Sequence, residues 1–234
     1  MISFSGHNPI LGLSEISDGD MKITPEGDNR VAFLNRKNFL SRRGLSAADL
    51  VSVFLSHGTN LAIVGTEERG DTVYDCDGLI TATPGVILSI SVADCLPLYF
   101  FDPKRQVIAL AHAGWKGVLA EIAPLVIKKM AQDFNCSPAD IQVFIGPHLG
   151  QCHFGIQDDL VEKFFNYPEC ISRIGEKKYL DFAKALQRQL LAQGIKEENL
   201  AISSECTHCS TAKYFSYRRD RDPLRTMLAY LLLQ

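Results

Sequence analysis

Three side chains with metal-binding or nucleophilic chemistry lie just beyond the ends of short apolar segments. They are His57, Cys95 and His112. Two imidazoles and one thiolate are a ligand set that zinc uses when a fourth position is kept open for reaction. The three residues are too far apart in the chain for a compact zinc finger, so only the fold could bring them together. Otherwise they are a buried thiol and two unrelated histidines.

The same three residues allow two further functions. In a cysteine hydrolase, Cys95 would be the nucleophile, His112 or His57 its base, and an aspartate would orient that base. In a binding module without catalytic activity, a zinc ion would serve stability alone.

The elements that must position these residues are mostly strands. The apolar residues either alternate, as half-buried strands require, or form short runs. The predicted strands are 50–56, 86–92, 96–101, 106–111 and 141–145. Segment 227–233 is apolar but fits a strand or a helix, and the polar segment 14–30 is predicted to be a loop.

Helices are fewer. We predict them over 117–132 with a kink at Pro124, over 158–165, and over 179–193, where Gly194 is the expected C-cap. Strands outnumber helices and do not alternate regularly with them. The sequence therefore predicts an α+β fold with mixed β-sheets flanked by helices, in a single domain over residues 1–234.

The composition of the chain excludes several classes of protein. Its formal net charge is −3 over 234 residues, which gives no basic footprint for nucleic acid. No stretch approaches the roughly 18 apolar residues of a membrane helix, and the N-terminus lacks the basic start of a secretory signal. Seven cysteines, an odd number, favour free thiols over a disulfide framework. We therefore expect a cytoplasmic protein.

Several local motifs occur in an order that resembles the YfiH-like family, also called the laccase-domain or polyphenol oxidase family. The motifs are, in order, Asn35-Arg36, His57-Gly58, Asp77-Gly78-Leu79-Ile80-Thr81, Ala93-Asp94-Cys95-Leu96-Pro97, Ala111-His112-Ala113-Gly114-Trp115-Lys116-Gly117, Ile145-Gly146-Pro147 and Phe215-Ser216-Tyr217-Arg218-Arg219-Asp220. Each motif alone is weak, but the ordered set is specific and spans residue 31 to the C-terminus.

The resemblance implies a YfiH-like α+β fold, also described as a cysteine hydrolase fold. It implies a His57–Cys95–His112 site, often with zinc, that carries out both catalysis and metal binding. The implied reactions are phosphorolysis of adenosine, inosine, guanosine and methylthioadenosine, and deamination of adenosine. The implied partners are a nucleoside and phosphate, for a monomer or weak dimer. Editing of peptidoglycan precursors is also attributed to bacterial members.

A copper-dependent polyphenol oxidase is the other activity that the family name implies. A multicopper site needs many histidines, commonly in His-x-His pairs. This chain has six histidines and no such pair, so we expect zinc rather than copper.

Further residues could complete the site. Arg36 is a candidate phosphate ligand, because a guanidinium binds phosphate in a bidentate fashion. Asp77 is a candidate for substrate binding, for a proton shuttle or for orienting a ligand histidine, and Asp94 for an orienting or turn-forming role. The segment Cys206-Thr207-His208-Cys209 is a lone Cys-x-x-Cys without a second pair. We therefore expect few ligands for a structural zinc there, with His208 and Cys209 incidental.

Overall fold

The computed structural model describes residues 9–221 and 225–234 and contains three β-sheets. The strands are β1 Ile10–Leu13, β2 Leu50–Val53, β3 Leu61–Ile63, β4 Thr72–Val73, β5 Gly78–Thr81, β6 Ile87–Val92, β7 Leu96–Asp102, β8 Val107–Ala113, β9 Gln142–Ile145, β10 Gly155–Ile156, β11 Ile171–Ile174, β12 Lys177–Leu180, β13 Leu200–Ile202 and β14 Met227–Leu232.

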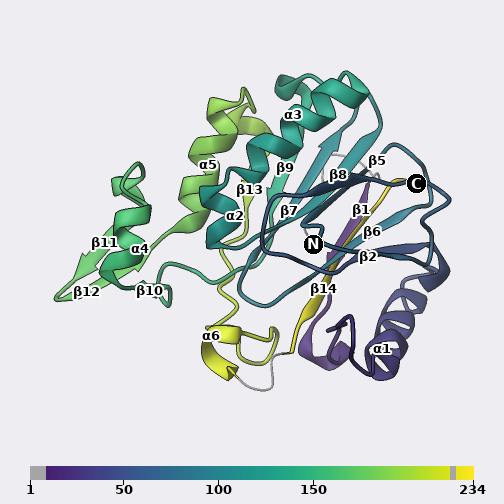
Figure 1. The fold of residues 1–234 in the computed structure, drawn as a ribbon, viewed down its shortest axis with the longest axis horizontal. Helices are drawn as coiled ribbons and strands as arrows, with labels where there is room; N and C mark the ends of the chain where they lie inside the picture. Colours follow the sequence, from purple (N-terminus) through teal and green to yellow (C-terminus); the bar gives the residue numbers. More distant parts are fainter. Residues whose placement is uncertain (1–8, 222–224) are drawn as a thin grey trace.

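The helices contain fewer residues in total than the strands and lie outside the two large sheets (Figure 1). They are α1 Arg30–Ser41, α2 Trp115–Leu119, α3 Ile122–Phe134, α4 Asp158–Lys163, α5 Phe182–Ala192 and α6 Tyr217–Asp220. Among the described residues, no helix has the length and apolar character needed to cross a membrane.

Two large sheets form the centre of the molecule. One has the strand order β1-β14-β6-β2-β4 and the other β13-β9-β7-β8-β5-β3, and both mix parallel with antiparallel pairs. Successive side chains in a strand point to opposite faces. Tyr99 and Phe101 of β7 therefore join the core between the sheets, whereas Leu98 and Phe100 join the core beneath the helices.

Helices α1, α2, α3 and α5 cover the outer faces of these sheets and produce a layered arrangement (Figure 1). Helices α2, α3 and α5 bury apolar side chains against the β7–β8 sheet, with Val126 and Leu186 among them. Helix α1 packs Phe39 and Leu40 against the opposite sheet, where Phe39 meets Tyr230 edge to face. A small third sheet, β10-β12-β11, lies with α4 away from this stack. The predicted α+β class with mixed sheets is confirmed.

Two of the predicted helices begin or continue differently from the expectation. The predicted helix 117–132 is two helices, α2 and α3, because Glu121 between them adopts a left-handed backbone conformation (φ 59°). Pro124 does not kink a helix but lies in the first turn of α3, where its missing N–H costs nothing. Helix α5 begins at Phe182 because the residues before it pair in β12. Gly194 follows α5 with φ 91°, but it lies one residue after the C-cap, which is Gln193.

The remaining expectations concern the two ends of the chain. Segment 227–233 is strand β14, which is paired on both sides by β1 and β6. The segment predicted as a loop, 14–30, contains a short 3-10 helix over Ile16–Asp18, and its last residue, Arg30, begins helix α1, which was not predicted.

Candidate active site and metal centre

The β7–β8 ladder brings Cys95 beside His112. Pro97 pairs with His112 in this antiparallel ladder, and Cys95 lies in the turn between β6 and β7, two residues before Pro97. His112 is the penultimate residue of β8, not a residue beyond its end as predicted. The ladder register therefore fixes the relative positions of the thiol and the imidazole.

Asp77 connects His57 to the same place. The Asp77 carboxylate accepts hydrogen bonds from the backbone N–H groups of His57 and Gly58, both at 2.8 Å, and from the Ser56 hydroxyl at 2.6 Å. The Asp77 carbonyl accepts the backbone N–H of His112 at 2.8 Å. Asp77 is fully buried. It thus holds the turn that carries His57, whose own backbone is left-handed (φ 59°), against the end of β8.

His57, Cys95 and His112 converge. Their ligand atoms all lie within 4.8 Å of one another. The two imidazole rings meet edge to face with centroids 4.8 Å apart. His57 is exposed, Cys95 is half-buried and His112 is buried, so the cluster is open on one side. Gly114 keeps the space beside it free, because a Cβ there would lie 3.2 Å from the Cys95 sulfur and within 4 Å of both imidazoles.

The charges around the two histidines give them opposite pKa shifts. Burial lowers the pKa of His112, but the Cys95 side chain and the Asp77 carboxylate outweigh it and raise that pKa to about 9. Burial and the neighbouring His112 lower the pKa of His57. Burial raises the pKa of Asp77, but hydrogen bonds to its charged form, including those from Ser56 and Gly58, lower it overall. Asp77 is therefore a carboxylate at neutral pH.

The residues present fit a metal ion. His112 Nδ1 is buried, makes no hydrogen bond to any described residue, and lies 3.5 Å from Asp77 Oδ1. A carboxylate behind one imidazole nitrogen is the usual arrangement when the histidine binds a metal, because it fixes the ring and raises its basicity. Three ligands of this type leave a fourth position open, which is typical of catalytic zinc.

Two cavities meet at Cys95. The first, the aromatic cavity, has a volume of about 360 Å³ and is lined by Trp115, Phe154 and Phe182 among others. The second, the N-terminal cavity, has a volume of about 560 Å³; its lining includes His57, His112 and residues 22–25. Ala93, Cys95 and Tyr217 line both. These volumes suit a small-molecule ligand.

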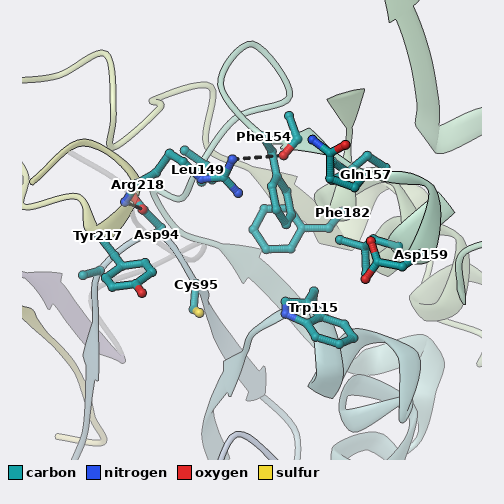
Figure 2. Close-up of a pocket in the computed structure, with 14 residues that line it drawn as sticks. Asp94, Cys95, Trp115, Leu149, Phe154, Gln157, Asp159, Phe182, Tyr217 and Arg218 are labelled. Atoms are coloured by element: carbon teal, nitrogen blue, oxygen red, sulfur yellow. Dashed lines mark hydrogen bonds between the residues drawn. The ribbon is translucent and has the colours of Figure 1, made fainter. Parts of the chain in front are cut away.

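Figure 2 shows Cys95 between Tyr217 and Trp115, with Phe154 and Phe182 across the aromatic cavity. The Arg218 guanidinium donates to the Gly155 carbonyl at 3.0 Å and lies over the Phe154 ring. Sequence reasoning did not identify Phe154 or Phe182 as site residues, because no local pattern marks them. Tyr217 belongs to one of the motifs that carry the family resemblance, so that motif was a usable signal.

Asp94 shapes the turn that presents Cys95. Its backbone is left-handed (φ 83°), its Oδ1 accepts the Thr207 hydroxyl at 2.6 Å, and its Oδ2 accepts the backbone N–H of Arg218 at 2.6 Å. These contacts agree with the predicted turn-forming role. They also join the β6–β7 turn to the segments that carry Thr207 and Arg218.

Arg36 lies beneath the N-terminal cavity. It is 2% exposed, and its guanidinium donates to the Met21 carbonyl and to the hydroxyls of Ser52 and Ser91. Burial lowers its pKa to about 10. Ser91 itself lines the cavity. Arg36 itself does not line the cavity, so direct contact between Arg36 and a phosphate would require Ser91 or a neighbouring residue to move aside.

A second group of potential metal ligands lies elsewhere. Cys152, His153, Cys206 and Cys209 place four ligand atoms within 4.8 Å of one another. The prediction that the Cys-x-x-Cys segment has few ligands to draw on was wrong, whereas the view of His208 and Cys209 as incidental stays a prediction. The error arose because the second pair, Cys152-His153, comes from a distant turn that no sequence spacing connects to Cys206.

Comparison with known proteins agrees with the motifs. The family model described as multi-copper polyphenol oxidoreductase laccase matches residues 17–234. Purine nucleoside phosphorylase YlmD from Geobacillus stearothermophilus is 34% identical over 188 residues, which cover 75% of this chain and 69% of that protein. Adenosine deaminase RL5 from an unknown prokaryotic organism is 28% identical over 207 residues, which cover 82% and 79%.

Solved structures give the same result. The crystal structure of YlmD from Geobacillus stearothermophilus superposes with a TM-score of 0.92 at 29% identity, over 97% of this chain and 93% of that chain. The structure of the hypothetical protein YfiH from Bacillus licheniformis superposes with a TM-score of 0.90 at 26% identity, with the same coverage. The chain therefore belongs to the laccase-domain family of YfiH and YlmD.

Proposed function

We propose that the protein is a zinc-dependent purine nucleoside enzyme acting at His57, Cys95 and His112. Its reactions are phosphorolysis of adenosine, inosine, guanosine and methylthioadenosine, and deamination of adenosine. The observation that carries the proposal is the open His-Cys-His cluster at the junction of two cavities. Relatives named purine nucleoside phosphorylase and adenosine deaminase support the same reaction class.

Each residue of the cluster has a role in this proposal. His57, Cys95 and His112 hold the ion, and Asp77 orients His112 and fixes the turn of His57. When bound, zinc supplies a Lewis acid that activates an oxygen nucleophile near neutral pH. Zinc fits better than a multicopper centre, since the described cluster offers only two imidazoles and one thiolate. A single copper ion with the same ligands is the competing metal.

The two cavities suggest how a nucleoside and phosphate would bind. The aromatic cavity offers Trp115, Phe154 and Phe182 to a purine base, because aromatic rings stack favourably on one another. The N-terminal cavity offers Lys22 and Ser91 to phosphate, with Arg36 behind Ser91. The ribose would then lie at Cys95, where the cavities meet. Asp77 is buried below this surface, so we assign it positioning of the ligands and not contact with substrate.

The test combines metal analysis with product analysis. Purified wild type, Cys95→Ala and the control Cys136→Ser are compared for zinc and copper content. Each is then incubated with inosine, guanosine, adenosine and methylthioadenosine, with and without phosphate. We expect free base only when phosphate is present, and inosine from adenosine without phosphate. Cys95→Ala should lose one zinc ion and both activities.

The control variant Cys136→Ser tests whether the loss of any thiol, irrespective of its position, lowers zinc content or activity. Cys136 packs in the core at the end of α3 and lines neither cavity, so Cys136→Ser should retain zinc and activity. A zinc-loaded wild type that converts none of the four nucleosides would contradict the proposal. Copper in place of zinc, with oxidation of a phenol, would support the polyphenol oxidase instead.

A cysteine hydrolase is the second candidate. The observation in its favour is that His112 lies between Cys95 and Asp77, with its pKa raised by both, as a base between a nucleophile and an orienting acid would be. This candidate requires hydrolytic activity in chelated protein and loss of that activity on alkylation of Cys95. The nucleoside enzyme instead requires that chelated protein is inactive and that activity returns only when zinc is restored.

The predicted cytoplasmic location and the predicted monomeric or weakly dimeric state stay predictions.

A further inference from the structure

The second cluster joins two turns that are far apart in the chain. Cys152 and His153 lie in the turn between β9 and β10, and Cys206 and Cys209 lie in the turn between β13 and α6. A short parallel bridge between His148 and Cys206 aligns the two segments. Neither the aromatic nor the N-terminal cavity includes any of these four ligand residues. The nucleoside reaction proposed above does not use them.

Three of the distances in the cluster match a tetrahedron of ligands around an ion, and the Cys206 sulfur lies within 4.8 Å of the other three ligand atoms. With Zn–S bonds of about 2.3 Å and Zn–N bonds of about 2.0 Å, sulfur atoms lie about 3.8 Å apart and sulfur and nitrogen about 3.5 Å apart. The sulfur atoms of Cys152 and Cys209 are 3.7 Å apart. His153 Nδ1 lies 3.2 Å from the Cys152 sulfur and 3.3 Å from the Cys209 sulfur.

The backbone around the cluster is arranged for a thiolate. The N–H of Gly150 donates to the Cys206 sulfur at 3.3 Å. Such a bond stabilises negative charge on a sulfur ligand and holds it in position. Gly150 is also required sterically, since a Cβ there would lie 3.2 Å from Cys206 Cβ and 3.3 Å from the Cys152 sulfur. The turn of Cys206-x-x-Cys209 is closed by the Ser210 N–H, which donates to the Cys206 carbonyl at 3.0 Å.

A disulfide explains the cluster less well. All the cysteines in the structure are free, and the Cys152–Cys209 separation is far above the roughly 2.05 Å of an S–S bond. A disulfide would also use two of the three thiols and would give no role to His153. Three thiols and one imidazole instead match a closed structural zinc site.

We propose that Cys152, His153, Cys206 and Cys209 bind a second, structural zinc ion. Because all four positions of the ion are filled by protein, this zinc does no chemistry. It cross-links the β9–β10 turn to the β13–α6 turn. His208 stacks on His153 with ring centroids 3.8 Å apart and supports the ring without binding the ion.

The two cross-linked turns carry residues of the aromatic cavity. Phe154 and Gly155 follow His153 directly, and Tyr217 and Arg218 belong to the helix that follows the second turn. Arg219 donates to the carbonyls of Thr207 and His208, which connects this helix to the proposed zinc site. The ion would therefore fix the far wall of the cavity relative to Cys95. Its loss should weaken substrate binding more than the chemical step.

The experiment counts zinc at the two sites separately. Wild type should carry about two zinc ions per chain, and Cys95→Ala and Cys206→Ser about one each, because each variant destroys one site. Cys170→Ser, which removes a buried thiol outside both clusters, should retain both ions. Wild type with a single zinc that disappears in Cys95→Ala would overturn the proposal. So would a Cys152–Cys209 disulfide found by mass spectrometry of unreduced protein.

Cobalt substitution gives a readout that needs no activity. Thiolate-to-cobalt charge-transfer absorption scales with the number of thiolate ligands. Cys95→Ala should therefore keep most of the wild-type absorption, since three of the four proposed thiolates remain. This measurement stays decisive if Cys206→Ser fails to fold. Near-complete loss of the absorption in Cys95→Ala would contradict the second site.

Two histidine variants test the ligand assignment. His153→Ala should lose the second zinc or bind it far more weakly, whereas His208→Ala should retain it. The reverse result would overturn the assignment of His153. Loss of nucleoside turnover in wild type would bear only on the proposed function, because zinc content and cobalt absorption do not depend on it.

Discussion

The two Cys/His clusters differ in how their ligands are positioned and in how many they bring. His112 is the penultimate residue of β8, the register of β7 and β8 fixes it beside Cys95, and the buried Asp77 holds the turn of His57 against the same strand. The second cluster comes from two turns, which the His148–Cys206 bridge and the bond from Gly150 to Cys206 align. The first has three ligands at the junction of two cavities, and the second has four ligands that line neither.

The difference suggests a division of tasks between the clusters. A site that needs one open position must be held by the rigid part of the fold, because the protein has to resist filling that position itself. A site with four ligands can hold flexible segments together, since the bound ion supplies the rigidity. We therefore expect chemistry at the cluster of His57, Cys95 and His112 and stabilisation at the cluster of Cys152, His153, Cys206 and Cys209.

Matched histidine variants should separate the clusters by the largest margin. His112→Ala should lower kcat/KM for phosphorolysis of inosine by at least about 10³-fold, since a metal ion supplies several kcal/mol of charge stabilisation. His153→Ala should lower it by less than about tenfold, mainly through KM, because it loosens only the cavity wall. Steady-state kinetics decide this, and equal losses of kcat in the two variants would contradict the division of tasks.

Zinc binding to the first cluster should depend strongly on pH. The pKa of His112 is raised to about 9, so the metal-free protein carries a proton there at neutral pH, and zinc must displace it. From this residue alone, zinc affinity should fall roughly tenfold per pH unit below 9. Competition with a chelator dye in Cys206→Ser isolates this site. An affinity that is constant between pH 7 and 9 would contradict the contact between His112 and its acidic neighbours.

The raised pKa of His112 has the opposite effect on the stability of the metal-free protein, which should fall as pH rises. Because the folded pKa of His112 is above its unfolded value of about 6.5, protonation stabilises the fold fully below that pH. This contribution should be lost as pH rises towards 9. Chemical denaturation of chelated protein at pH 6.5 and pH 9 measures it, with His112→Gln as the comparison that should flatten the difference.

Asp77→Asn should have a smaller effect on the same cluster. The change keeps the shape of the side chain but removes the negative charge behind His112 and weakens the bonds from Ser56 and Gly58. Loss of such an orienting partner typically costs about 10–100-fold in metal affinity or activity. Activity and zinc affinity should fall together. Normal zinc affinity with lost activity would make Asp77 a proton shuttle instead.

Much of the fold could be predicted because its strands have clear apolar patterns. Segments 86–92, 96–101 and 141–145 are strands within one residue of the prediction. Helix α1 was not predicted, since Val31, Phe33 and Leu34 are exposed in it and blur the apolar stripe. The break between α2 and α3 depends on the left-handed conformation of Glu121, which could not be predicted because glutamate rarely adopts it.

The sequence predicted which residues form the candidate site but not how they are arranged in space. His57 and Cys95 follow predicted strands and His112 lies next to the last residue of one, so their positions could be predicted from the sequence. Sequence gives no register, so the pairing of Pro97 with His112 could not be derived. The second cluster was missed for a related reason, because turn-to-turn contacts such as the His148–Cys206 bridge leave no periodic pattern.

A matched pair of glycine variants should give the smallest and most selective effects. In Gly114→Ala the new Cβ would lie 3.2 Å from the Cys95 sulfur, and in Gly150→Ala it would lie 3.2 Å from Cys206 Cβ. Each neighbour must shift by a few tenths of an ångström, an overpacking that typically costs about 1–3 kcal/mol. The added Cβ crowds the His57–Cys95–His112 cluster in Gly114→Ala and the second cluster in Gly150→Ala. The two variants should therefore differ in their effect on activity. Gly150→Ala should lower Tm by roughly 2–10 °C in a chain of this size while kcat stays within about twofold. Gly114→Ala should lower Tm by a similar amount and should also lower activity, because its Cβ lies against the Cys95 sulfur and both imidazoles. If both variants lost activity equally, the two clusters would have to be coupled through the aromatic cavity more tightly than their separate turns imply.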